Sequence, residues 1–89
     1  MVWGDIMDKK IGVVGIVVEN LESAKYVNEI LHEYSSIIVG RMGIPYRTRG
    51  IAIISLIVDG TSDAISAMTG KLGKIKDLTV KTAITKYSK

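Results

Sequence analysis

Three arginines lie in and beside a glycine-containing turn near the middle of the sequence, and their chemistry suggests a ligand. Arg41 precedes the stretch from Gly43 to Gly50, and Arg47 and Arg49 lie within it, whereas every other basic residue except the single histidine is a lysine. A guanidinium group binds a planar carboxylate or a phosphate through two parallel hydrogen bonds. The spacing favours an anion-binding turn that uses Arg41, Gly43, Arg47 and Arg49, and a solvated basic loop is the alternative.

A second group of candidates, Gly70, Lys71 and Gly73, lies at the expected end of a helix. Glycines at such a place commonly end the helix, because a left-handed conformation costs little only for glycine. The segment is not a phosphate-binding loop, since it follows a helix instead of a strand and lacks the required spacing. Its exposed glycines would still let a ligand approach the backbone, so these three residues complete the predicted ligand-binding set.

Neither a metal centre nor a catalytic centre is predicted. His32 is the only histidine, and a metal site needs three or four ligands, so a histidine at the boundary of the core is favoured. A site shared between subunits, with Glu29 or Glu33, stays open. The serines show no nucleophile motif with histidine and acid partners, so we predict a protein that is not an enzyme.

Two apolar segments at residues 11–18 and 51–58 carry no charge on either alternating face. Such strands are typical of a sheet that is covered on both sides. A chain of 89 residues has few elements to provide that cover. We therefore predict a homo-oligomer, a dimer or higher, that assembles through the helix-free face of the sheet.

The remaining elements follow from periodicity and capping residues. Asn20 is expected to cap a helix whose buried stripe includes Leu21, Val27 and Leu31. Thr61 or Ser62 is expected to cap a second helix. Strands are expected at residues 10–18, 37–42, 51–58 and 78–84, with an irregular connection at 43–50 and an edge strand last.

This order of elements predicts an α+β fold, the ferredoxin-like βαββαβ sandwich, with a four-stranded antiparallel sheet and two helices on one face. The strands at 10–18 and 51–58 would be central. Residues 10–89 would form a single domain, and residues 1–9 a flexible leader.

Composition restricts the location and the partners. The chain has no cysteine, no apolar run of the roughly 20 residues that span a bilayer, and no signal peptide, so a cytoplasmic protein without membrane contact is expected. Six lysines and one acid lie between Lys71 and Lys89. Spaced lysines protect an edge strand from aggregation, and they also suit nucleic acid.

Several strings resemble the small regulators of the iron-only ([FeFe]) hydrogenase system: VNEILH at 27–32, RMGIP at 41–45, IAII at 51–54, SAMTGKLG at 66–73 and LTVKT at 78–82. The resemblance covers residues 10–82. It implies a regulatory role and a ferredoxin-like fold akin to ACT domains and to the C-terminal domain of nickel-responsive regulators. The chain lacks the turn of amino-acid-binding ACT domains, the histidine set that binds nickel, and a ribbon-helix-helix segment, so direct sequence-specific DNA binding is not expected.

The leading hypothesis is thus a non-enzymatic oligomeric regulator that senses a small ligand or binds a protein of the hydrogenase system. A nucleic-acid-associated accessory protein that uses the lysine-rich C-terminal region is the alternative. A small enzyme of the dimeric-barrel type ranks last, because the inward stripes are nearly all aliphatic. The effector and any cofactor are not assigned.

Overall fold

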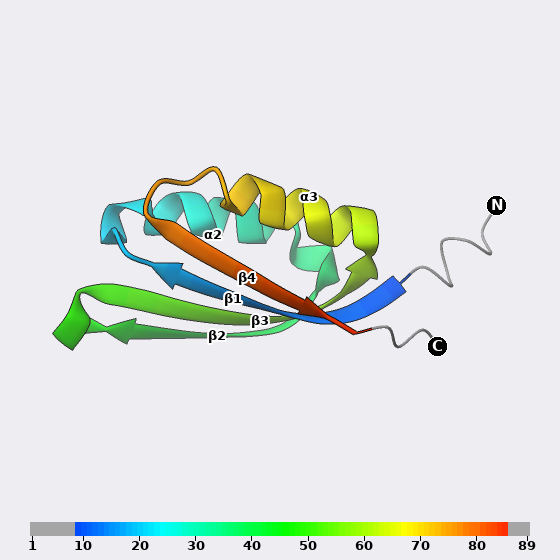
Figure 1. Cartoon of the computed structure of the whole chain (residues 1–89), viewed down its shortest axis with the longest axis horizontal. Coiled ribbons are helices and arrows are strands. Elements are labelled where there is room, and N and C mark those ends of the chain that lie inside the picture. Colours follow the sequence, from blue (N-terminus) through cyan, green and yellow to red (C-terminus); the bar gives the residue numbers. More distant parts are fainter. Residues whose placement is uncertain (1–8, 86–89) are drawn as a thin grey trace.

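The computed structural model describes residues 9–85, which form a four-stranded antiparallel sheet with both helices on one face (Figure 1). The strand order is β2-β3-β1-β4, so β1 and β3 are central, as predicted. The elements are β1 (Lys9–Val18), η1 (Leu21–Ser23), α2 (Ala24–Glu33), η2 (Ser35–Ile37), β2 (Ile38–Tyr46), η3 (Arg47–Arg49), β3 (Ile51–Thr61), α3 (Ser62–Leu72) and β4 (Leu78–Ile84). This is the expected ferredoxin-like α+β fold. The strand β1 begins one residue before the predicted boundary, and the rest of the predicted leader lies outside the described residues.

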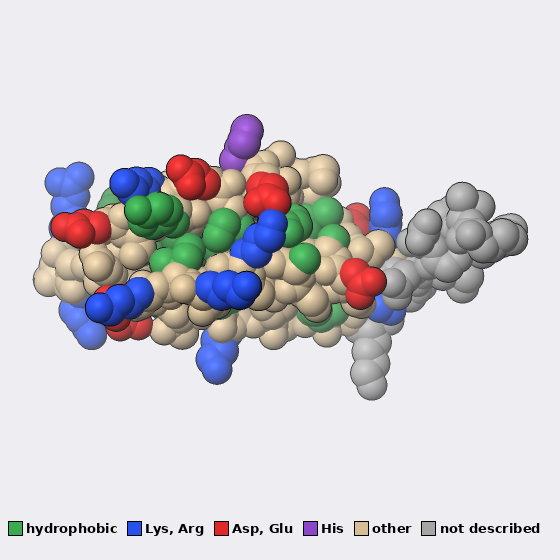
Figure 2. Space-filling view, turned by 90° about the horizontal axis from the view of Figure 1, so that it is seen from above, with side chains coloured by type: hydrophobic (Ala, Val, Ile, Leu, Met, Phe, Trp, Pro, Cys, Tyr) green, Lys and Arg blue, Asp and Glu red, His purple; other side chains and the backbone are tan. Residues whose placement is uncertain are grey.

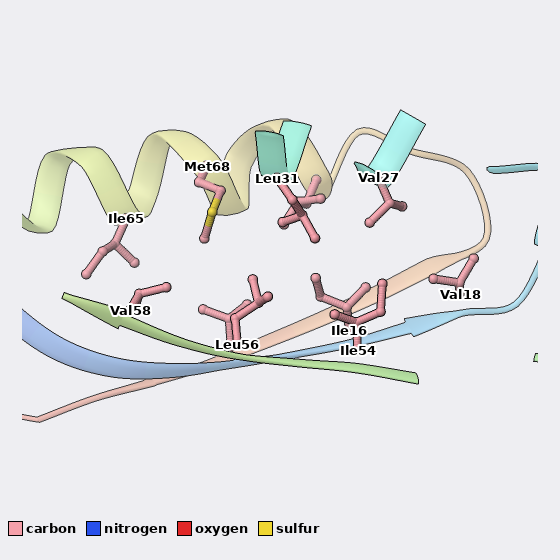
Figure 3. Packing of buried hydrophobic residues seen from close by; sticks show 11 residues of the cluster. Ile16, Val18, Val27, Leu31, Ile54, Leu56, Val58, Ile65 and Met68 are labelled. Carbon is pink, nitrogen blue, oxygen red and sulfur yellow. The ribbon is translucent and has the colours of Figure 1, made fainter. Parts of the chain in front are cut away.

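The core lies between the helices and one face of the two central strands, as Figure 3 shows. Alternate residues of β1 and β3 point toward the helices, which is the period of two that a strand imposes. The buried apolar side chains are Val14, Ile16, Val18, Val27, Leu31, Ile54, Leu56, Val58, Ile65, Met68 and Leu72. Full burial of each such side chain stabilises the fold by about 1.5–3 kcal/mol before conformational entropy is subtracted.

The predicted caps start both helical segments: Thr61 caps α3, and Asn20 caps the turn η1 that leads into α2, whose own N-cap Ser23 makes no side-chain cap hydrogen bond. Asn20 accepts a hydrogen bond from the backbone N–H of Glu22 at 3.0 Å, and the Thr61 hydroxyl accepts one from Ala64 at 3.1 Å. The first turn after Asn20 is a 3-10 turn, which rotates Leu21 away from the core and leaves it 52% exposed, so its place in the buried stripe was wrong. Neither helix of the described chain is long and apolar enough to cross a membrane.

The second strand is longer than expected. The irregular connection predicted from Gly43 to Gly50 is wrong in its first half, because β2 continues through Pro45 to Tyr46 and Pro45 pairs opposite Ala52. Proline is tolerated here since β2 is an edge strand. The true turn is η3 followed by Gly50, whose φ of 67° is left-handed.

The outer strand β2 also carries a bulge near its start. Its register against β3 shifts between Ile38 and Gly40, so Val39 has no partner in the ladder and is 67% exposed. Such a bulge bends β2 and changes where its side chains point. The neighbouring strand β3 runs on to Thr61, beyond the predicted end at Val58.

The left-handed residue after α3 is an aspartate and not the expected glycine. Asp77 has a φ of 59°, while Gly73 has a right-handed φ of −65°. Aspartate is among the few non-glycine residues that adopt this conformation readily. The Asp77 carbonyl accepts a hydrogen bond from the backbone N–H of Glu19 at 3.0 Å, which joins the end of β1 to the start of β4.

Candidate functional site

The helix-free side of the sheet is an apolar surface, which we call the open face. Figure 1 shows that none of the described helices covers this side of the sheet. The register places seven large apolar side chains on it, each 38–62% exposed: Ile11, Val13, Met42, Ile44, Tyr46, Ile53 and Ile57. These residues come from β1, β2 and β3, so the apolar surface is continuous across three strands.

Small residues form a hollow in the open face. Gly15 pairs opposite Ser55, which in turn pairs opposite Met42. A shallow cavity of about 190 Å³ lies here, lined by Gly40, Arg41, Met42, Ser55 and Ile57. The hollow has larger apolar rows on both sides, since Val13 pairs with Ile57 and Val17 with Ile53.

A larger cavity lies on the other side of β2, between this strand and α2. We call it the α2–β2 cleft; it has a volume of about 460 Å³ and is lined by Asn28, Leu31, His32, Ser35, Ile38, Val39, Gly40 and Arg41. Ligand sites in proteins commonly measure about 300–1,000 Å³. Its lining combines apolar side chains with an amide, an imidazole, a hydroxyl and a guanidinium group.

One hydrogen bond crosses this cleft. The Arg41 guanidinium donates from Nη2 to Oδ1 of Asn28 at 3.0 Å, which connects β2 to α2. Arg41 faces the helices because it pairs opposite Leu56, a core residue of β3. In residues 9–85, no carboxylate forms an ion pair with Arg41.

The other arginines of the predicted turn lie farther along the hairpin. Gly43 is on the same side of β2 as Arg41, and Arg47 and Arg49 are exposed in η3. Five residues of strand separate Arg41 from the end of β2, or about 17 Å at the usual rise. The hairpin therefore spreads the three arginines over its length instead of gathering them around one point.

The predicted residues at the end of α3 lie beside α2. Lys71 forms an ion pair with Glu33 at 2.6 Å and lies 5.1 Å from the centre of the Tyr34 ring. The hydrogen bond to Glu33, and then one to Tyr34, raise the pKa of Lys71 above its ordinary value of 10.5. An anionic ligand at Lys71 would have to compete with Glu33.

The two glycines of this group differ in their surroundings. A Cβ on Gly70 would meet no atom within 4 Å, so its surface is open to a ligand. A Cβ on Gly73 would lie 3.3 Å from the carbonyl oxygen of Thr69, and the Gly73 N–H donates to that oxygen at 2.9 Å. Gly73 therefore takes part in ending the helix.

The single histidine lies at the cleft. His32 is exposed and lines the α2–β2 cleft, and the single histidine projects from the margin of the helix-bearing face in Figure 2. No group of three or more His, Cys, Asp or Glu side chains within the described part of the chain could hold a metal ion. Asn28 and Ser35, which the sequence analysis did not select, join Arg41 and His32 at this cleft.

Comparison with solved structures identifies the fold in unrelated proteins. A formyltetrahydrofolate deformylase from Pseudomonas putida KT2440 superposes with a TM-score of 0.60 at 9% sequence identity. The match includes 82% of this chain and 28% of the deformylase chain. CPII from Thiomonas intermedia K12, a nitrogen regulatory PII-like protein, has a TM-score of 0.56 at 8% identity, over 85% of this chain and 89% of its own. At such identities the likeness concerns the fold alone. Comparison with curated protein sequences gave no match.

One family accounts for most of the chain. Residues 10–82 match the model of the TM1266-like family, described as "Iron-only hydrogenase system regulator, putative". The structure of the uncharacterized protein TM1266 from Thermotoga maritima has a TM-score of 0.83 at 43% identity, and covers 88% of this chain and 99% of its own. The match confirms the resemblance drawn from the sequence strings, and the chain belongs to the TM1266-like family.

Proposed function

We propose that this protein is a non-enzymatic regulatory module of the iron-only hydrogenase system, located in the cytoplasm. It works as a homo-oligomer that assembles through the open face, and it responds to a small ligand or to a protein of the hydrogenase system. The observation that carries the proposal is the continuous apolar surface of the open face.

The size of this surface argues for a partner. Seven side chains, each about half exposed, present roughly 600 Å² of apolar area if each contributes about 90 Å². Monomeric proteins rarely expose contiguous apolar patches larger than a few hundred Å². Two such faces together would bury about 1,200 Å², the lower end of the range for specific interfaces.

The shape of the surface argues for a second copy as that partner. The hollow at Gly15 and Ser55 lies between the apolar rows that contain Val13 and Val17. In a twofold-symmetric dimer the same surface of each copy forms the interface. An apolar row of one copy would therefore face the hollow of the other. At about 25 cal/mol per Å², the buried area gives a gross stabilisation larger than the cost of association.

The test is the oligomeric state of two matched variants. Ile57 on the open face and Leu21 in η1 are exposed to a similar extent, 49% and 52%, but they lie on different surfaces. We expect Ile57→Lys to weaken association at least tenfold, because the new charge would be buried without a partner. Leu21→Lys should leave association unchanged.

The measurement is sedimentation velocity together with light scattering over a range of protein concentrations. A wild-type protein that stays monomeric throughout would contradict the assembly. The same holds if Ile57→Lys associates as strongly as the wild type, since the interface would then lie elsewhere.

Ligand sensing is the second part of the proposal, with Arg41, Gly43, Arg47, Arg49, Gly70, Lys71 and Gly73 as the contacts first expected from the sequence. A ligand that binds only the folded protein raises its melting temperature. A screen of metals, nucleotides, amino acids and iron-sulfur precursors by thermal shift therefore identifies the effector. Replacing all three arginines by glutamine should abolish the shift, and an unchanged shift would exclude them.

A further inference from the structure

The α2–β2 cleft has a rigid apolar floor. Leu31 is only 1% exposed and belongs to the core, and Ile38 packs against that core from the start of β2. Because these side chains are already ordered by packing, an apolar group that enters the cleft does not have to order them first. The floor favours a ligand with a compact apolar body.

One wall of the cleft carries a positioned positive charge. Asn28 holds the Arg41 guanidinium at 3.0 Å through a neutral amide oxygen, which orients the group and leaves its charge uncompensated. A guanidinium has five N–H donors, of which this bond uses one. Arg41 thus retains donors for an anion, and Asn28 acts as a positioning residue.

The remaining polar groups favour a carboxylate over a phosphate. Ser35 and His32 line the rim, and His32 is in the last turn of α2, where the helix dipole is negative. A phosphate, which carries up to two charges, is best bound by several cations or by a helix N-terminus. A carboxylate carries one charge and fits a single guanidinium through two hydrogen bonds.

We propose that the α2–β2 cleft binds a small organic carboxylate, with its carboxylate on Arg41 and its apolar body against Ile38, beside the buried Leu31. This inference rests on the ligand-sensing role proposed above and names the chemical class of the ligand. It also makes Asn28 the residue that positions Arg41, and it places His32 and Ser35 beside the ligand.

The probe is 4-methylpentanoate. Its binding is monitored through the amide chemical shifts of the ¹⁵N-labelled protein. We expect saturable shifts at Leu31, Ser35, Val39 and Arg41. The alcohol 4-methylpentan-1-ol, which has the same carbon skeleton without the charge, should bind at least tenfold more weakly. Inorganic phosphate should cause no saturable shift at these residues. If phosphate binds there more tightly than the carboxylate, the ligand class is wrong.

The decisive variant is Asn28→Asp, which has nearly the same shape as the wild-type side chain. It places a carboxylate against the Arg41 guanidinium and thereby supplies an internal competitor for the ligand. Affinity for 4-methylpentanoate should fall at least tenfold while the melting temperature stays equal or rises. Arg41→Lys keeps the charge but loses the paired donors, so it should weaken binding about fivefold or more.

The control is Lys25→Gln, which changes the net charge by the same amount as Asn28→Asp and lies on the same helix. It should leave the affinity within about twofold of the wild type. Equal losses in Lys25→Gln and Asn28→Asp would show that only general electrostatic attraction is at work, and would overturn the site. Wild-type affinity in a folded Asn28→Asp would also overturn it.

Light scattering of the same samples separates this inference from the assembly. A protein that oligomerises but does not bind 4-methylpentanoate contradicts the cleft site and leaves the assembly standing. A monomer that binds the carboxylate at the cleft supports the site and contradicts the assembly.

Discussion

Gly60, near the end of β3, is a position where one added methyl group should disturb the fold. The Cβ of an alanine would lie 2.9 Å from Cγ2 and 3.1 Å from Cβ of Ile37. Rotation of the Ile37 side chain could relieve the first contact but not the second, because Cβ is fixed to the backbone. The clash must therefore displace η2 or the end of β3.

The magnitude follows from two opposing terms. Overpacking a well-packed site costs about 1–3 kcal/mol. Replacing glycine by alanine returns about 0.4–1 kcal/mol by restricting the unfolded chain. We expect Gly60→Ala to lower the free energy of unfolding by about 1–2 kcal/mol, and the melting temperature by about 4–8 °C for each kcal/mol in a domain of this size.

The assay is urea unfolding at one fixed protein concentration, since any association adds to the apparent stability. Gly43→Ala is the matched control: it is also a strand glycine, but its Cβ would lie 4.0 Å from Cγ1 of Ile54, an ordinary contact. Its stability should stay within about 0.5 kcal/mol of the wild type. Equal stabilities of the two variants would refute the packing of Ile37 on Gly60.

Three further perturbations test local features. Gly50→Ala should lower the free energy of unfolding, measured in urea, by about 1–2 kcal/mol. The φ of residue 50 is 67° and no atom lies within 4 Å of the new Cβ, so backbone strain is the only penalty. Unchanged stability would contradict the turn geometry. Asn20→Ala should cost about 1 kcal/mol by removing the helix cap, whereas Asn20→Ser should retain most of the stability. The raised pKa of Lys71 means that its ion pair with Glu33 stabilises the fold fully below pH 10.5 and is lost as the pH rises through the higher folded-state value. Thermal unfolding on both sides of that pH should show a smaller alkaline loss in Glu33→Gln, and identical pH profiles would exclude the pair as the cause.

The sequence predicted those parts of the fold that depend on local rules. Asn20 and Thr61 are caps because a short polar side chain can accept a hydrogen bond from the next turn. The strands β1 and β3 were recognisable because both of their faces are apolar. The prediction for β2 ended too early because Pro45 was taken as an interruption of the ladder. Proline is accepted in an edge strand, and the predicted central positions of β1 and β3 leave β2 at an edge.

The cleft was only partly predictable. Arg41 was selected for its chemistry, but its bond to Asn28 depends on how α2 packs against β2 and leaves no trace in the periodicity of either element. Lys71 was selected with Gly70 and Gly73 as a ligand contact at the end of the second helix, and its pairing with Glu33 is likewise a tertiary contact between two helices. Side chains that meet only through tertiary packing carry no local signal.

The irregular outer strand β2 disfavours one route of association, the addition of a strand to this edge of the sheet. Val39 stands outside the ladder and Pro45 has no backbone N–H, so this rim offers an interrupted row of hydrogen-bonding groups to an approaching strand. Growth by strand addition would continue without limit and produce fibrils, whereas two faces that cover each other leave nothing for a third copy. Strand addition at the β2 edge is therefore disfavoured, even though apolar side chains are exposed beside it.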